Sequence, residues 1–199
     1  GLWSPIKAEI SRGRPSSPQL VSPIKSKSSK NFSSYLLLLP VFLLSLVPLA
    51  GIKEFNDPHE FLMIVLISLI IGCIEEIEYR GFMKIGFSSF SKKTFIWGSS
   101  TIFGLAHFLN LIYGADIIDT LVQVVFAFCF GLIFSAFYYK NGQLLPLIIL
   151  HALWAFNISL AVQPMKAPLD TIHTISLLLL VLYGLGVGIW HSQKKAAAS

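Results

Sequence analysis

Six long runs of the chain contain no charged residue, and short polar connections separate them. A helix needs about 20 apolar residues to cross the roughly 30 Å hydrocarbon core of a membrane, and most of the runs approach or exceed that length. None shows the ten-residue apolar and polar alternation of an outer-membrane barrel. The pattern therefore predicts an all-α fold, a polytopic transmembrane helical bundle with about six spans, at Tyr35–Ile52, Phe61–Ile74, Thr94–Ala115, Thr120–Tyr139, Gln143–Met165 and Thr171–Gln193.

The second run is the shortest, and it ends just before Glu75. It reaches the thickness of a membrane only if the helix continues through Glu76, Glu78 and Arg80. We therefore expect ionisable side chains at membrane depth. Such groups are costly there, and they usually mark function.

The composition agrees with a membrane protein. The chain is 54% hydrophobic and 13% charged, whereas an ordinary soluble domain has about 25% charged residues. A water-soluble globule is excluded, because the apolar excess must face lipid. Cys73 and Cys129 both lie inside apolar runs, so we expect them to pack in the bundle and to form neither a disulfide framework nor a cysteine-based zinc site.

The distribution of basic residues predicts the orientation, because cytoplasmic loops retain Lys and Arg. With six spans, thirteen of the fifteen basic residues fall on one side of the membrane, and the exceptions are Lys53 and Lys166. We therefore expect an integral, multi-pass membrane protein with both termini in the cytoplasm.

Three regions follow from this division. Residues 1–34 are rich in serine and proline with one acid, so we expect a disordered basic tail that is attracted to anionic lipid headgroups rather than to nucleic acid. A transit peptide is a lesser alternative for this tail. Residues 35–193 form the predicted bundle, and residues 194–199 form a C-terminal tail that resembles an expression-tag remnant.

Helical geometry separates the roles of the acids that follow the second run. Glu76 and Arg80 are four residues apart with the acid first, which is the favourable order for an ion pair along a helix. Glu75 points about 100° away from Glu76 and has no basic neighbour within one turn. An unpaired carboxylate in apolar surroundings accepts a proton readily, as a general base must. Glu78 lies closer to water, and we expect it to be solvated.

Two histidines complete a candidate site. The helical rise from each expected entry point places Glu75, His107 and His151 in the cytoplasmic half of the membrane, on three different helices. A single intramembrane histidine is often only a packing residue. A carboxylate and two imidazoles at similar depth, however, can converge to activate a water and stabilise an oxyanion.

These segments resemble the CPBP family, the CAAX-protease and bacteriocin-processing membrane proteins also called the Abi family. The likeness covers residues 61–163, in three motifs that occur in the family's order. They are EExxxR at Glu75, Glu76 and Arg80, FxxxH at Phe103 and His107, and an HxxxN-type motif at His151.

The resemblance implies a glutamate-dependent intramembrane endopeptidase without a cofactor. The third motif departs from the Asn-type members, because Ala155 stands where they carry an amide. Asn157 is turned about 200° from His151 and does not replace that amide. We therefore expect one oxyanion donor fewer and a slow enzyme. The implied roles are water activation by Glu75 and His107, oxyanion binding by His151, and support of the site by Glu76, Arg80 and Phe103.

Two other functions stay open from the sequence. One is a non-catalytic bacteriocin self-immunity or accessory protein on the same scaffold. The other is a zinc site at Glu75, His107 and His151 with an open position for water. Zinc is disfavoured because neither histidine has an evident acidic partner and Glu76 is already paired. For the enzyme, we expect peptide substrates presented from the membrane near its cytoplasmic face, namely prenylated CAAX-type tails, leader peptides or membrane-embedded segments.

Overall fold

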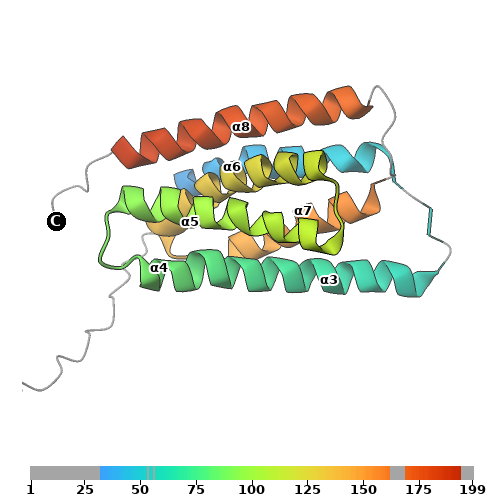
Figure 1. Cartoon of the computed structure of the whole chain (residues 1–199), viewed down its shortest axis with the longest axis horizontal. Helices are drawn as coiled ribbons and strands as arrows, with labels where there is room; N and C mark the ends of the chain where they lie inside the picture. Colours follow the sequence, from blue (N-terminus) through green and yellow to red (C-terminus); the bar gives the residue numbers. More distant parts are fainter. Residues whose placement is uncertain (1–31, 53, 56, 162–168, 194–199) are drawn as a thin grey trace, which may run out of the picture.

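The computed structural model describes residues 32–52, 54, 55, 57–161 and 169–193, and most of them are helical (Figure 1). Within these ranges there is no strand, and Ile52 and Ala161 form an isolated bridge. The fold is therefore all-α, as the apolar pattern predicts. The predicted tails at 1–34 and 194–199 lie outside the described residues, except that residues 32–34 belong to the first helical segment.

Prolines divide the first apolar run into three short pieces. They are the 3₁₀ helix η1 (Phe32–Leu37), the α-helix α2 (Leu39–Ser45) and the 3₁₀ helix η2 (Val47–Ala50). Pro40 and Pro48 each lie in the first turn of the piece that follows. Proline lacks a backbone N–H and is compatible only with the start of a helix. The run Tyr35–Ile52 is therefore not one continuous helix.

The second run does continue through its acidic residues. Helix α3 (Pro58–Glu76) begins at Asp57, whose side chain accepts a hydrogen bond from the backbone of His59. It passes directly into a π-helix, η3 (Ile77–Phe82), and then into α4 (Met83–Gly86). The predicted extension of this helix past Glu75 is confirmed.

The third run changes its winding at a predicted site residue. Helix α5 (Lys92–Ala106) is followed by a 3₁₀ helix, η4, that begins at His107 and ends at Tyr113. Gly114 then adopts a positive φ of 85°, which favours glycine, before the chain turns into α6 (Ile117–Asn141). The last two helices are α7 (Leu145–Leu160) and α8 (Leu169–Gln193).

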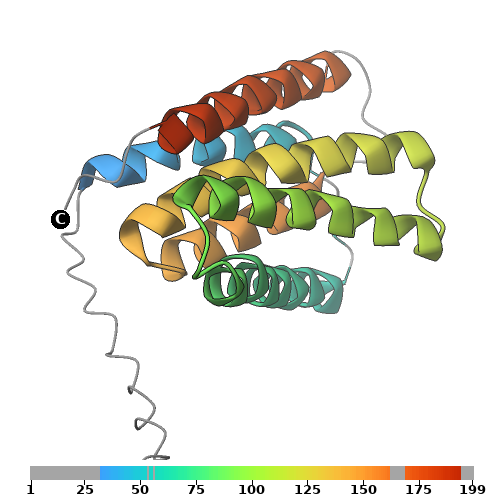
Figure 2. The same cartoon turned by 60° about the vertical axis from the view of Figure 1, so that its left-hand side comes forward.

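Helix α6 is the centre of the bundle. Every residue from Cys129 to Phe137 is buried, and the helix contacts α5, α8, η1, η3 and η4. Helices α3 and α8 lie on opposite sides of the molecule, with α5, α6 and α7 between them (Figures 1 and 2). A helix that is apolar all round belongs inside such an assembly.

Successive passes along the bundle run in alternating directions (Figure 1). The start of η1, the end of α4 and the end of α8 lie at one end of the molecule, while the ends of η4 and α7 lie at the other. By length and apolar composition, three helical stretches of the described chain are candidate membrane spans: Lys92–Tyr113, Ile117–Asn141 and Thr171–Gln193. The apolar stretches Leu39–Leu49 and Leu145–Leu160 are shorter.

Candidate active site

The ion pair predicted from spacing is present and fully buried. Arg80 Nη1 donates to Glu76 Oε1 at 3.1 Å, and both side chains have 0% exposure. The guanidinium lies over the ring of Phe103, 4.6 Å from its centroid, and 5.4 Å from that of Phe134. Burying either charge alone would be very costly, so each requires the other.

His151 is held by the same carboxylate. Its Nδ1 lies 2.7 Å from Glu76 Oε1, so that one oxygen accepts hydrogen bonds from both Arg80 and His151. Because Glu76 Oε1 also accepts from Arg80 in the ion pair, we assign the proton of its contact with the imidazole to Nδ1. In a neutral His151 the other nitrogen, Nε2, then presents a lone pair.

That second nitrogen faces Glu75. His151 Nε2 lies 3.4 Å from Glu75 Oε2, and the Glu75 side chain is 29% exposed. The four side chains therefore form a series from Arg80 through Glu76 and His151 to Glu75, from the fully buried interior to a partly open position. This arrangement can pass a proton between His151 and Glu75 while Glu76 fixes the orientation of the imidazole.

Aromatic rings enclose His151 on its remaining sides. Phe103 of α5 and Phe130 and Phe134 of α6 have ring centroids 5.2 to 6.3 Å from that of His151, all in edge-on geometry. Such rings exclude water and lower the local polarity, which strengthens the charged interactions among the acids and the imidazole.

His107 lies at the edge of this arrangement. Its ring packs edge-on against Phe103 with centroids 5.1 Å apart, and its Nδ1 is 3.0 Å from the Phe103 carbonyl oxygen. Among the described residues it has no direct hydrogen bond to Glu75 or His151. The structure therefore links Glu75, Glu76, Arg80, Phe103 and His151 in one connected cluster, and among the described residues it joins His107 to that cluster through Phe103.

A close approach of two helices makes the contact between the acids and His151 possible. A Cβ atom on Gly72 would lie 2.8 Å from the Ile148 carbonyl oxygen and 2.9 Å from the Ala152 nitrogen. Gly72 is therefore what lets α3 lie against the backbone of α7, beside His151 and one turn before Glu75 and Glu76. The sequence signal for it is a glycine one turn ahead of the paired acids.

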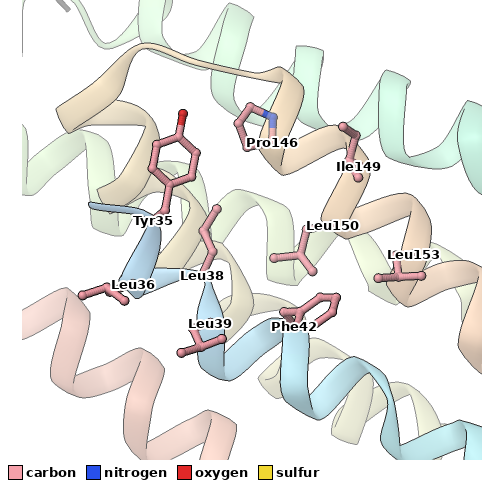
Figure 3. A pocket seen from close by; sticks show the side chains of 9 residues that line it. All are labelled: Tyr35, Leu36, Leu38, Leu39, Phe42, Pro146, Ile149, Leu150 and Leu153. Carbon is pink, nitrogen blue, oxygen red and sulfur yellow. The ribbon is translucent and has the colours of Figure 1, made fainter. Parts of the chain in front are cut away.

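Two apolar grooves flank α7, and none of the predicted catalytic residues lines them. The larger, of about 440 Å³, lies between α7 and the first helical pieces (Figure 3). The smaller, of about 280 Å³, lies between α3 and α7 and includes Ser68 and Ala152. The larger groove is lined by Tyr35, Leu36, Leu38, Leu39, Phe42, Pro146, Ile149, Leu150 and Leu153.

Asn157, which follows the third motif, has a structural partner. Asn157 Nδ2 donates to the Ser45 carbonyl oxygen at 2.8 Å and is buried, so it joins α7 to the end of α2 and does not face His151.

The argument against a zinc site assumes that neither His107 nor His151 has an acidic partner. That assumption is wrong, because Glu76 is the partner of His151. Within the described ranges, no group of three or more His, Cys, Asp or Glu side chains is arranged to hold a metal ion.

Comparison with known protein families finds a match for the middle of the chain. A family model described as the Rce1-like type II CAAX prenyl endopeptidases matches residues 57–157, about half of the chain. The chain belongs to this family. The matched residues run from the start of α3 to Asn157 and contain the whole cluster around His151. The sequence matches no curated protein and no solved structure.

Membership in the Rce1-like family agrees with the resemblance drawn from the three motifs. The family is one of proteases, and the apolar helices of this member indicate a membrane protein. Sequence reasoning missed the parts of the candidate site that depend on the tertiary structure, namely Gly72, the Phe130 and Phe134 rings, and the bond between Glu76 and His151.

Proposed function

We propose that the chain is an intramembrane endopeptidase in which Glu75 is the general base that activates the attacking water. The observation that carries this proposal is the series Arg80, Glu76, His151 and Glu75, buried among apolar helices and open only at Glu75. A structural bundle gains little from four ionisable groups at this depth, because each has a desolvation cost.

In the proposed reaction Glu75 accepts a proton from water while the water oxygen bonds to the scissile carbonyl carbon. The carbonyl π electrons move to its oxygen, which becomes an oxyanion. When the tetrahedral intermediate collapses, the C–N bond breaks and the proton passes from Glu75 to the departing amine. The products are a carboxylic acid and an amine, so one water is consumed and Glu75 returns to its starting state.

His151 and His107 have separate parts in this proposal. His151 is held by Glu76 through Nδ1, so its Nε2 faces Glu75. When that nitrogen also carries a proton, it can donate a hydrogen bond to the oxygen on which charge develops. His107 Nδ1 lies against the Phe103 carbonyl oxygen, which leaves Nε2 as the nitrogen assigned in this proposal to the water or the substrate. Glu76 and Arg80 position His151 and touch no substrate.

The proposed substrates are peptides presented from the membrane, and a prenylated CAAX-type tail is the first choice because of the family description. Both termini of the protein are proposed to be cytoplasmic, with cleavage close to that face. The apolar groove between α3 and α7 has Ala152, the neighbour of His151, in its wall, and it suits a membrane-embedded apolar chain.

The test uses an internally quenched peptide that ends in a farnesylated Cys-aliphatic-aliphatic-X tail, with protein in detergent and in lipid vesicles. Wild type is expected to cleave it and Glu75→Gln to lose cleavage, with unfolding temperature retained. The matched control is Glu78→Gln, because Glu78 is three residues on and exposed. Full activity of Glu75→Gln would overturn the proposal.

Two further arms address the open alternatives. Cleavage by chelator-washed protein without bound metal supports the reaction as written, and loss of cleavage that zinc restores would replace it with a zinc mechanism. If the chain is instead an accessory or immunity protein, wild type and Glu75→Gln are both expected to leave the peptide intact. The two proteins are then expected to bind the peptide equally.

A further inference from the structure

The indole nitrogen of Trp154 is a buried hydrogen-bond donor without a partner among the described residues. Such a group costs free energy, because its hydrogen bond to water has been lost and not replaced. Most buried polar groups in native proteins are paired, so each exception needs an explanation. Here the unpaired donor lies on α7, three residues after His151.

Trp154 and Ala155 flank the same face of α7, one turn beyond His151. On a helix, the side chain three positions along points about 60° to one side of the starting side chain. The side chain four positions along points about 40° to the other side. The indole of Trp154 and an amide at position 155 would therefore lie on either side of the direction in which His151 points. The rings of His151 and Trp154 both pack edge-on against Phe130, with centroids 5.2 and 5.9 Å from it.

The other side-chain donors nearby are already engaged or enclosed. Asn157 donates to Ser45 on α2. Arg80 has N–H groups without hydrogen bonds, but its guanidinium has 0% exposure and lies against Phe103 and Phe134. His107 Nδ1 is bonded to the Phe103 carbonyl, and in the proposed reaction its Nε2 serves the water.

We propose that Trp154 Nε1–H donates a hydrogen bond to the substrate carbonyl oxygen as it becomes an oxyanion, in place of the amide that Ala155 cannot supply. This inference rests on the proposed function and adds a substrate-contacting residue to it. No proton is transferred by the indole. The bond strengthens as negative charge develops on the oxygen, which is how a preorganised donor accelerates such a step.

The surroundings of the indole favour this role. Its ring centroid lies 4.7 Å from that of Phe126, and the contact with Phe130 fixes it from a second direction. A donor held by packing needs no reorganisation when the charge forms, and it acts more strongly away from water.

The first experiment measures kcat and KM on the farnesylated quenched peptide. Trp154→Phe keeps an aromatic ring and removes only the N–H, so we expect kcat to fall about 10²- to 10³-fold with KM little changed. Adding Ala155→Asn to this variant is expected to restore much of the loss. The matched control is Trp97→Phe, because the Trp97 indole donates to Ser192 between α5 and α8, and kcat should be retained. Wild-type kcat in Trp154→Phe would overturn the inference and leave the proposed function intact.

The second experiment does not depend on turnover or on the folding of Trp154→Phe. In Glu75→Gln protein with ¹⁵N-labelled tryptophan, the indole N–H resonances are recorded with and without an aldehyde analogue of the farnesylated peptide. The Trp154 resonance is expected to move downfield while that of Trp97 stays. If the Trp154 resonance moves but wild type does not cleave the peptide, the hydrogen bond from Trp154 is upheld and the proposed proteolysis is overturned. If the Trp154 resonance does not move at a saturating concentration of the analogue, the proposed hydrogen bond is overturned.

Discussion

One oxygen atom organises the candidate site at the scale of the residue. Glu76 Oε1 accepts one hydrogen bond from Arg80, which lies further along the same helical segment, and another from His151 on α7. The first contact is local and supports the charge of Glu76. The second fixes the tautomer and the orientation of His151, and so decides which nitrogen faces Glu75.

Glu76→Gln is expected to lower the free energy of unfolding by roughly 3–5 kcal/mol, because it leaves the buried Arg80 charge without its counter-ion. Among the described residues, Glu75 forms no ion pair within its own helical segment, so Glu75→Gln should leave stability close to that of wild type. Thermal unfolding in one detergent compares the two variants, with Glu78→Gln expected within about 0.5 kcal/mol of wild type as the control. Equal stability of the Glu75 and Glu76 variants would contradict the separate roles assigned to them.

At the scale of the element, α3 and α7 form a contact that depends on the absence of a side chain. Gly72 lies against the backbone of Ile148 and Ala152, and backbone atoms cannot move aside as a flexible side chain can. The π-helix that follows α3 has wider turns than an α-helix, and such segments are common at functional sites. It contains Arg80, whose guanidinium nonetheless reaches Glu76.

Gly72→Ala is expected to separate α3 from α7 and to destabilise the bundle by about 1–3 kcal/mol through overpacking. Because a displacement of about 1 Å in a catalytic group costs up to about 10²-fold in rate, cleavage per folded molecule should fall as well. The measurements are unfolding temperature and kcat. Gly186→Ala in α8 is the control, since a Cβ there meets nothing within 4 Å and a helical alanine is favoured over glycine. If both variants behaved alike, the close helix contact would not be what positions the acids.

At the scale of the whole molecule, the alternating passes place the start of η1 and the end of η4 at opposite ends of the bundle (Figure 1). The distribution of Lys and Arg predicts that the η1 end faces the cytoplasm. Both features agree with the proposal of a multi-pass protein with its termini in the cytoplasm.

Cysteine labelling in sealed right-side-out vesicles tests this orientation. In a background of Cys73→Ala and Cys129→Ala, Tyr113→Cys is expected to react with a membrane-impermeant maleimide from outside, since Tyr113 is 87% exposed at the end of η4. Ser33→Cys, at the start of η1, should react only after permeabilisation. The reverse pattern would contradict the cytoplasmic assignment, and labelling of both positions from one side would contradict their separation by the membrane.

The sequence determined the features that depend on neighbours along the chain. Apolar length predicted helices, the winding of a helix placed Arg80 beside Glu76, and the excess of apolar residues excluded a soluble fold. Pro40 and Pro48 are the local signal for the breaks in the first apolar run, although the length of that run alone predicted a single span. These properties are set by backbone geometry within a few residues, so no knowledge of the fold was needed.

Only the tertiary structure decided which side chains meet across helices. In a membrane bundle the lipid-facing and core-facing sides of a helix are both apolar, so hydrophobic periodicity does not specify how each helix is rotated. The approach of α3 to α7 at Gly72 fixes that rotation, and it brings His151 to Glu76 and Glu75. Among the described residues, the hydrogen bond and the ring contact of His107 are both with Phe103. Its expected depth matched that of the acids, but depth along a helix axis says nothing about direction around it.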